Sequence, residues 1–351
     1  MDGGPIGRED AGPTTPSPSV DTPQRRTFLL QVEERLDEVV RVDPDVDDAR
    51  TEALIDAARH LVQAGGKRAR PWFTMLLGET FALPAGPLCD LAVCVEMIHA
   101  ASLLHDDVVD EGTRRRGRPT ANAVWGNLTS VLSGDLLLTL ALGEIRGHPA
   151  ALHHAALDTV AAMTRATLRE AGARGQVELS PERWFQIAEG KTGALFALCG
   201  RGVGLLADRP DDAERLARAG NHLGLAFQIA DDLDDLLGRG AGKDPFADLR
   251  NRNPNVAVAM AVETSSALRR RLAAAWEDPH TGTDEFELLG RNVIDTGVAT
   301  RAWEAIGQHV AAAERELAPW SAEPAIALIC AWARRMWSRA EPDSKATCAV
   351  S

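Results

Sequence analysis

Apolar residues recur at every third or fourth position along most of the chain, and this spacing is typical of amphipathic α-helices. Strand-like alternation of apolar and polar residues is hardly visible. The pattern predicts helices over residues 27–40, 52–64, 71–81, 89–109, 121–145, 152–170, 181–206, 211–237, 255–276, 298–317 and 324–338. Gly and Pro residues gather between these ranges, where turns and loops belong. We therefore expect an all-α protein, with about ten helices in one domain over residues 26–340.

The two ends of the chain differ in composition from this helical part. Residues 1–25 are rich in Pro, Gly, Ser and Asp and lack the apolar segment of a secretory signal. Such a composition cannot bury enough apolar surface to offset the entropy lost on ordering, so we expect a disordered N-terminal tail. Residues 341–351 are expected to form a loose C-terminal tail. No run of 18 or more apolar residues occurs, so neither a membrane-spanning helix nor a stable membrane anchor is expected.

Composition narrows the function classes. The chain has 351 residues and a formal net charge of −13, so it lacks the basic excess that a nucleic-acid-binding protein uses to neutralise phosphates. Aromatic residues make up only 5% and Tyr is absent, which argues against a β-sandwich or β-barrel. The cysteines number five and show no metal-binding or redox spacing, as expected for buried, reduced thiols in a cytoplasmic protein.

Two acidic motifs of the form Asp-Asp-x-x-Asp each follow a predicted apolar helix segment. The first comprises Asp106, Asp107 and Asp110, and the second comprises Asp231, Asp232 and Asp235. Residues four apart share one face of a helix, so each motif places like charges side by side next to buried residues. A cation relieves that repulsion, and carboxylates without Cys or His neighbours suit Mg²⁺. A single copy is more often a solvated helix end, but two copies suggest a diphosphate held by a group of Mg²⁺ ions.

Positive charge is scarce, and it is concentrated at two places. Lys67, Arg68 and Arg70 lie in a Gly-rich connection between predicted helices, and Arg114–Arg118 follow the first acidic motif. By charge alone, either cluster could be a solvated loop. Beside two candidate Mg²⁺ motifs they indicate an anion site for two phosphate-bearing ligands, because Arg binds phosphate with a planar fork and Gly permits close backbone approach.

At these residues the chain resembles the trans-isoprenyl diphosphate synthase (polyprenyl synthetase) family, most closely its medium- and long-chain polyprenyl diphosphate synthases. The resemblance covers roughly residues 28–340 and is strongest over Glu96–Asp135. It continues in Lys191-Thr192, in Phe227-Gln228 with the second acidic motif, and in Gly242-Lys243-Asp244. The family fold is a bundle of antiparallel helices around a central cavity, which agrees with the all-α prediction. Its members are usually homodimers, so we expect a homodimer.

The resemblance implies a Mg²⁺-dependent enzyme that joins an allylic prenyl diphosphate to isopentenyl diphosphate and forms an all-trans polyprenyl diphosphate. It implies a group of about three Mg²⁺ ions with bound diphosphate, held by Asp106, Asp110 and Asp231, with Asp107, Asp232 and Asp235 in support. It implies that isopentenyl diphosphate is bound by Lys67, Arg70, His99 and Arg116. It implies that the allylic diphosphate is bound by Arg115, Lys191, Thr192, Gln228 and Lys243, with Lys191 and Lys243 also assisting catalysis. Without the resemblance, His99 is interpreted as a core histidine and Gln228 as an ordinary helix residue.

The length of the product is predicted from the helix that precedes the first acidic motif. Short-chain members of the family usually carry a bulky aromatic residue four or five positions before the first Asp, and here those positions hold Ser102 and Ala101. Two small side chains leave the hydrocarbon cavity open, so we expect a product of C20 or longer. An Ala101→Phe variant is expected to shorten the product.

The stretch after the second acidic motif departs from the family pattern. Phe246 stands where Gly is usual, and Asn253 and Asn255 stand where Lys and Thr are usual. The missing Lys normally helps to bind the diphosphate, and Arg250 or Arg252 could compensate for it. Two alternatives therefore stay open: a terpene cyclase or other lyase on the same scaffold, and a non-catalytic subunit of a hetero-oligomer. Retention of the isopentenyl diphosphate residues argues against the first alternative, and the two intact acidic motifs argue against the second.

Overall fold

The computed structural model describes residues 22–41, 49–115, 117–239 and 245–341. Within these ranges the protein is all-α, as predicted, apart from two short paired strands, β1 (Arg114–Arg115) and β2 (Arg118–Pro119). The tail residues 1–21 and 342–351, together with Arg116 and Lys243, lie outside the described residues.

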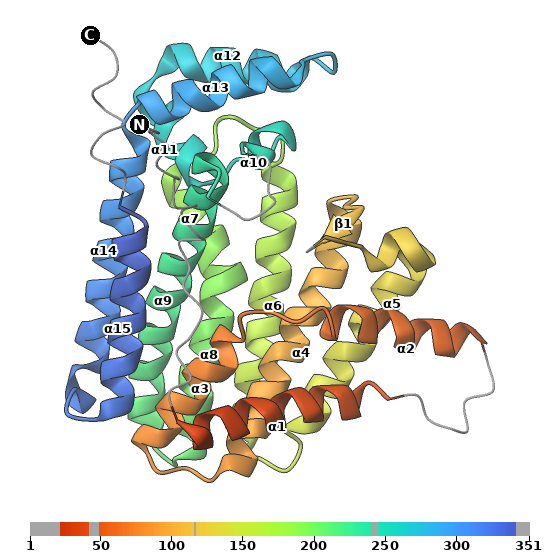
Figure 1. Ribbon diagram of the computed structural model, residues 1–351, viewed down its shortest axis with the longest axis vertical. Coiled ribbons are helices and arrows are strands. Elements are labelled where there is room, and N and C mark those ends of the chain that lie inside the picture. The colour runs from red at the N-terminus through yellow and green to blue at the C-terminus, as the bar shows by residue number, and fades with distance from the viewer. Residues whose placement is uncertain (1–21, 42–48, 116, 240–244, 342–351) are drawn as a thin grey trace, which may run out of the picture.

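Long helices make up most of the described chain. In order they are α1 (Pro23–Val39), α2 (Ala49–Val62), α3 (Ala69–Thr80), α4 (Ala85–Val109), α5 (Ala121–Glu144), α6 (Ala150–Ala173), α7 (Pro181–Ala188), α8 (Ala194–Leu206), α9 (Pro210–Leu237), α10 (Ala247–Arg250), α11 (Val256–Thr264), α12 (Ser266–Glu277), α13 (Thr283–Asp295), α14 (Val298–Leu317) and α15 (Pro324–Arg339). A π-helix, η1 (Glu189–Gly193), joins α7 to α8, and a 3₁₀ turn, η2 (Ala318–Trp320), follows α14. The helices α4, α6, α8, α9, α14 and α15 stand side by side, while α1 and α2 cross the lower part of this bundle and α12 and α13 lie across its upper end (Figure 1).

Three predicted helices are interrupted in the structure. The prediction of one helix over 255–276 is wrong, because Ser265 is extended and its hydroxyl accepts a hydrogen bond from the Leu268 N–H at 3.2 Å, which makes it the N-cap of α12. The predicted helix 121–145 bends at Gly126, whose φ of +83° lies outside the helical region. The predicted helix 181–206 contains the π-helix η1, in which one turn is wider than an α-helical turn.

Helices α10 and α13 are present although the apolar spacing did not predict them. In α13 the residues Phe286, Leu289, Gly290 and Val293 are buried, at the spacing of one helix face. The intervening residues are mostly polar, so the apolar spacing gives only a weak helical signal here. Helix α10 has only four residues, which is too short for a periodic pattern.

Aromatic contacts in the core join α3 and α9, which carry candidate site residues, to α15 and α8. Trp72 of α3 contacts Trp332 of α15, with 5.6 Å between ring centroids, and Phe196 of α8 contacts Phe227 of α9 at 6.0 Å. Trp72, Phe196 and Trp332 are fully buried. Large buried rings lose many contacts if they shift, so these pairs fix α3 relative to α15 and α8 relative to α9.

Helix α4 passes through this core. It is long and apolar enough to cross a membrane by composition alone, but 67% of its most apolar 18-residue window is buried inside the bundle. Such burial is typical of the core helix of a folded domain. The residues at its C-terminal end are therefore held by a rigid element.

Candidate active site

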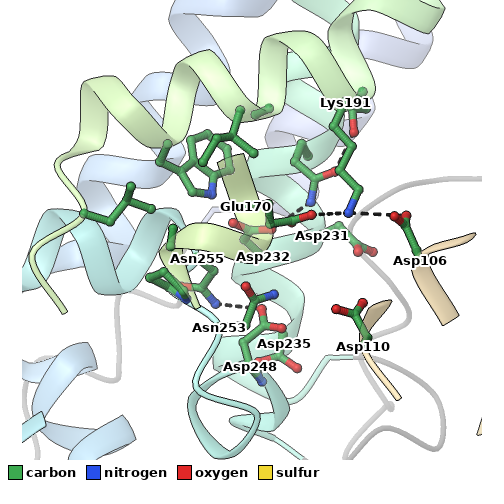
Figure 2. A pocket seen from close by; sticks show the side chains of 18 of the residues that line it. Asp106, Asp110, Glu170, Lys191, Asp231, Asp232, Asp235, Asp248, Asn253 and Asn255 are labelled. Carbon is green, nitrogen blue, oxygen red and sulfur yellow. Dashed lines mark hydrogen bonds and ion pairs between the residues drawn. The ribbon is translucent and has the colours of Figure 1, made fainter. Parts of the chain in front are cut away.

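Helices α4 and α9 carry the two acidic motifs to opposite sides of one cavity (Figure 2). Each motif lies at the C-terminal end of its helix, since α4 ends at Val109 and α9 ends at Leu237. The cavity has a volume of about 250 Å³. Among the residues singled out in the sequence, its lining includes Asp106, Asp110, Arg115, Lys191, Thr192, Gln228, Asp231, Asp232 and Asp235. The structure thus brings together the acidic motifs, apart from Asp107, and the described residues of the expected allylic diphosphate site.

The described lining of this cavity is strongly acidic. Its carboxylates are Asp106, Asp110, Glu170, Asp231, Asp232, Asp235 and Asp248, and its cations are Arg115 and Lys191. Burial raises the pKa of Asp106 against the attraction of Lys191, and burial together with the charge of Asp248 raises the pKa of Asp232 well above its usual range. The C-terminal end of a helix also carries partial negative charge, which disfavours further anions there. Additional positive charge in this cavity would therefore stabilise the ionised carboxylates.

The π-helix η1 places a lysine between two of these carboxylates. Lys191 forms ion pairs with Glu170 of α6 and with Asp106, where Nζ and Oδ2 are 3.3 Å apart. Burial alone would lower the pKa of Lys191, but the charges of Asp106 and Glu170 outweigh it and raise the pKa, so the ammonium group is positive. Next to it, a Cβ on Gly190 would lie 2.8 Å from the Cβ of Ala166, so η1 packs closely against α6. The position of the lysine is therefore fixed by packing.

A chain of hydrogen bonds joins η1 to the second acidic motif. The hydroxyl of Thr192 donates to Oε1 of Gln228 at 2.8 Å, and Nε2 of Gln228 donates to Oδ1 of Asp232 at 2.9 Å. The N–H of Val256, at the start of α11, donates to Oδ2 of Asp232 at 2.9 Å. Both oxygens of Asp232 accept hydrogen bonds, so the orientation of this carboxylate is fixed.

Asp107 differs from the other acidic-motif residues. It is buried, it is not part of the described cavity lining, and it accepts hydrogen bonds from Arg115, with Nε 2.9 Å and Nη2 2.8 Å from Oδ1. Arg115 itself reaches the lining. The contact with Asp107 therefore holds the Arg115 side chain in position.

The segment that departs from the family pattern also contributes to the cavity. Asn253 and Asn255 line it, and the amide of Asn255 donates to Oδ2 of Asp248 at 2.9 Å. The carbonyl oxygen of the same side chain accepts a hydrogen bond of 3.1 Å from the N–H of Val258, so Asn255 is also the N-cap of α11. Arg250, one of the expected replacements for the missing Lys, donates to the backbone carbonyl of Pro245.

The backbone conformation at Phe246 explains why the family usually has Gly at this position. Its φ is +65°, in the left-handed region that disfavours side chains with a Cβ. Its ring packs onto α13, where a Cβ on Gly290 would lie 2.3 Å from the nearest ring atom. Contact between this ring and the glycine offsets the backbone strain at Phe246.

The first basic cluster lies on the aromatic core and not in the lining of the acidic cavity. The guanidinium of Arg70 lies 5.0 Å from the ring centroid of Phe196, and the ammonium group of Lys67 lies 6.0 Å from that of Phe227. Burial lowers the pKa of Arg70, partly offset by the charge of Glu96. Among the described residues the buried Nε of Arg70 has no hydrogen-bond partner. A buried donor without a partner is a candidate contact for a ligand oxygen.

Arg68 and His99 have different surroundings. The guanidinium of Arg68 contacts Glu33, with 2.6 Å between Nε and Oε1, and Glu96, with 2.7 Å between Nη1 and Oε2. Both sides of the Arg68 guanidinium thus contact carboxylates, and these ion pairs join α1 to α4, while its expected part in holding a phosphate stays a prediction. His99 is half-buried on α4, about two turns before Asp106.

An apolar groove begins beside Asp106, between α4, α5 and α6. Its volume is about 280 Å³, and its lining includes Ile98, Ser102, Leu138, Val160, Met163 and Leu168. Asp106 lines both the groove and the acidic cavity, so the two are adjacent. Ser102 thus faces the groove, whereas Ala101 is fully buried and outside its described lining.

Glu170 and Asp248 are site residues that the sequence did not reveal. Glu170 lies three residues before the end of α6, at positions i+4 and i+7 from the buried Ala166 and Met163. A carboxylate that continues a buried helix face is a signal that points to such a site. Asp248 lies in the four-residue helix α10 and gives no periodic signal.

Sequence similarity places the chain in a known family. The model of the polyprenyl synthetase family matches residues 51–289. The chain belongs to the polyprenyl synthetase family. It is 36% identical over 299 residues to the nonaprenyl diphosphate synthase of Mycobacterium tuberculosis, a match that covers 84% of this chain and 87% of that relative. It is 32% identical over 280 residues to component 2 of the heptaprenyl diphosphate synthase of Geobacillus stearothermophilus, with 78% and 84% covered.

Solved structures agree with this family assignment. A polyprenyl synthase from Caulobacter crescentus, crystallised in complex with calcium and isoprenyl diphosphate, matches with a TM-score of 0.83 and 26% identity, over 93% of this chain and 99% of that one. The polyprenyl synthetase is thus an enzyme of prenyl transfer, and the predicted family and fold are confirmed.

The donor set of the acidic cavity fits Mg²⁺. The described lining contains carboxylate oxygens on two sides and no Cys or His. Over residues 22–41, 49–115, 117–239 and 245–341, no group of three or more His, Cys, Asp or Glu side chains is arranged to hold a metal ion by itself. A hard cation that takes further ligands from water and a diphosphate suits such a site.

Proposed function

We propose that this polyprenyl synthetase is a chain-elongating enzyme. It joins an allylic prenyl diphosphate to isopentenyl diphosphate with Mg²⁺ and releases an all-trans product of C20 or longer. The observation that carries the proposal is the adjacency of the acidic cavity and the apolar groove, which share Asp106. A ligand with a diphosphate head and a hydrocarbon chain fits this combination. The names of the nonaprenyl and heptaprenyl relatives support a long product.

The site residues differ in their proposed roles. Asp106, Asp110, Asp231, Asp232 and Asp235 would hold Mg²⁺, and Asp107, outside the lining, positions Arg115. When bound, Mg²⁺ would supply positive charge to the allylic diphosphate and to the departing pyrophosphate. Arg115 and Lys191 donate charge-assisted hydrogen bonds to the diphosphate oxygens, while Thr192 and Gln228 fix the second acidic motif. Lys243 and Arg116 keep the roles that the resemblance implies.

Isopentenyl diphosphate binds at the first basic cluster. Lys67, Arg70 and His99 hold its diphosphate, and the unpaired Nε of Arg70 donates to one of its oxygens. This contact directs the alkene toward the allylic carbon. Positioning of the two substrates supplies much of the rate enhancement, so the protein needs no nucleophile.

The two alternatives are less consistent with these residues. A cyclase or other lyase has no use for a second basic site, and the buried, unpaired donor of Arg70 therefore favours elongation. A non-catalytic subunit has no use for two acidic motifs that face each other across one cavity. One relative is named as component 2 of its enzyme. The test therefore asks whether this chain is active by itself.

One incubation separates the three functions. The purified protein is incubated with Mg²⁺ and allylic diphosphates of C5 to C20, with and without labelled isopentenyl diphosphate, and the products are extracted and analysed by chain length. Elongated products that require isopentenyl diphosphate support the proposal. Hydrocarbon formed without it supports the lyase, and absence of product in every arm supports the non-catalytic subunit.

We also propose a homodimer, formed through apolar side chains on α5 and α6. Leu128 and Leu168 each expose 75% of their surface, Val124 exposes 51% and Leu157 exposes 50%. Large exposed apolar side chains on adjacent elements are typical of a protein contact surface. The apolar groove lies between the same two helices and α4, so dimerisation shields it from water.

A further inference from the structure

We infer that Arg174 is an additional ligand of the allylic diphosphate, an inference that rests on the proposed function. Arg174 is the C-cap residue of α6 and follows Ala173, which lines the acidic cavity. Its Nη1 lies 3.4 Å from Oδ1 of Asp110, and its Nε donates to the backbone carbonyl of Asn251 at 3.2 Å. One guanidinium thus contacts both the first acidic motif and the loop between α10 and α11.

The backbone around Arg174 is fixed on both sides. The N–H of Arg174 donates to the carbonyl of Glu170 at 3.1 Å, and the N–H of Gly175 donates to the carbonyl of Arg252 at 2.8 Å. Gly175 has a φ of +77°, a conformation that glycine adopts readily. The end of α6 is therefore tied to the loop after α10, and this connection directs the guanidinium toward Asp110.

The ion pair between Arg174 and Asp110 is poorly suited to a purely structural role. The two side chains are 37% and 57% exposed, and ion pairs with this exposure contribute little to folding. The pair can therefore open at low cost when Asp110 binds a cation. The bond to Asn251 occupies one of the five N–H donors of the guanidinium, so the remaining donors can form a fork to diphosphate oxygens.

The other described cations of the site pair with carboxylates that are less exposed than Asp110. Lys191 is paired with Glu170 and Asp106, and Arg115 is paired with Asp107. Beside Arg174, the loop after α10 contributes Asn253, which is neutral, to the lining. Arg174 thus adds positive charge at the edge of the cavity next to this loop, and a diphosphate is the anion that the site is proposed to hold.

The test compares Arg174→Gln, Arg174→Lys and a control, Arg169→Gln, which removes an exposed arginine on the same helix. Steady-state kinetics are measured with a C15 allylic diphosphate and isopentenyl diphosphate, and binding of inorganic pyrophosphate in Mg²⁺ is measured by calorimetry. We expect Arg174→Gln to raise KM for the allylic diphosphate about tenfold and to weaken pyrophosphate binding about tenfold, with KM for isopentenyl diphosphate unchanged. Arg174→Lys recovers part of both losses, and Arg169→Gln behaves as the wild type.

Two results overturn the inference. One is an Arg174→Gln variant whose allylic KM and pyrophosphate affinity both stay within twofold of the wild type. The other is an equal rise in both KM values with no recovery in Arg174→Lys, since that result indicates loss of local structure. A wild-type protein that elongates nothing contradicts the proposed function, and the pyrophosphate titration then still decides the role of Arg174.

Discussion

The side-chain amide of Asn255 donates a hydrogen bond of 2.9 Å to Asp248, while its carbonyl oxygen caps α11. One side chain thus stabilises a helix and orients a carboxylate of the acidic cavity. Replacement of Asn255 by Ala is expected to lower the free energy of unfolding by about 1–2 kcal/mol, because it removes a cap and leaves Asp248 without this donor. Chemical denaturation measures the change.

A second substitution at Asn255 separates the two roles. Asn255→Asp keeps an oxygen to cap α11 but places a like charge opposite Asp248, so it is expected to gain more stability from added Mg²⁺ than the wild type does. If Asn255→Ala and Asn255→Asp respond equally to Mg²⁺, the amide does not orient the acidic cavity.

Glu170 is expected to control how readily the cavity takes up Mg²⁺. It forms an ion pair with Lys191, and in Glu170→Gln this lysine is left with Asp106 as its carboxylate partner. Because Lys191 then competes with the metal for Asp106, the Mg²⁺ concentration for half-maximal activity is expected to rise about three- to tenfold. Activity is measured over a Mg²⁺ titration. Glu178→Gln, which removes an exposed carboxylate beyond the end of α6, serves as the control and is expected to match the wild type.

The product-length prediction is sharpened by the positions of Ser102 and Ala101. Ser102 lines the apolar groove, so Ser102→Phe is expected to shorten the product, as shown by chromatography of the extracted prenyl chains. Ala101 is fully buried, so Ala101→Phe is expected to destabilise the fold by about 1–3 kcal/mol through overpacking, with a smaller effect on chain length than Ser102→Phe. A shorter product from Ala101→Phe at unchanged thermal stability would reverse this assignment.

The pH dependence of stability is expected to involve His309. Burial lowers its pKa to about 4, with a further contribution from His222, whose Nδ1 lies 3.0 Å from Nδ1 of His309. The unfolded chain takes up this proton near pH 6.5, whereas the folded protein does so near pH 4, so the free energy of unfolding decreases as the pH falls through this window. His309→Gln is expected to reduce the decrease by about 3 kcal/mol, measured by urea denaturation at several pH values. His280→Gln, at an exposed histidine, is expected to leave the slope unchanged.

Substitution of the exposed leucines on α5 and α6 tests whether this surface forms the proposed dimer. The double variant Leu128→Glu, Leu168→Glu is expected to sediment as a monomer, because two buried charges per protomer oppose association. Leu288→Glu changes a leucine that is 47% exposed on α13, away from α5 and α6, and is expected to keep the wild-type mass. A wild-type chain that sediments as a monomer, or a double variant that stays dimeric, would contradict this surface assignment.

The long helices were predictable because burial repeats along a helix. The range 298–317 agrees with α14 at both ends, and 89–109 agrees with α4 at its C-terminal end. Helix α4 begins four residues earlier, at Ala85, where small residues and Pro87 give no apolar period. The π-helix was not predictable from this pattern, since a single wider turn changes the apolar spacing by only one position.

The site was predictable where its chemistry is local in sequence. Asp106 and Asp110 are four residues apart on one helix, and that spacing alone indicates paired charges. The positions of Glu170 and Arg174 depend on how the end of α6 packs against η1 and against the loop after α10, which are separate in sequence. Only the folded chain brings Glu170 into the cavity lining and Arg174 next to Asp110.

The π-helix η1 restricts how the length of this protein can vary during evolution. Deletion of one residue from η1 would restore a continuous α-helix from α7 to α8 and rotate one part against the other by about 100°. Lys191 would then turn away from Asp106 although every residue of the site was still encoded. Insertions and deletions are therefore expected in the connections between helices and not across this turn. In homologues, the number of residues between Trp184 and Lys191 is therefore expected to stay constant even where the neighbouring apolar residues have diverged.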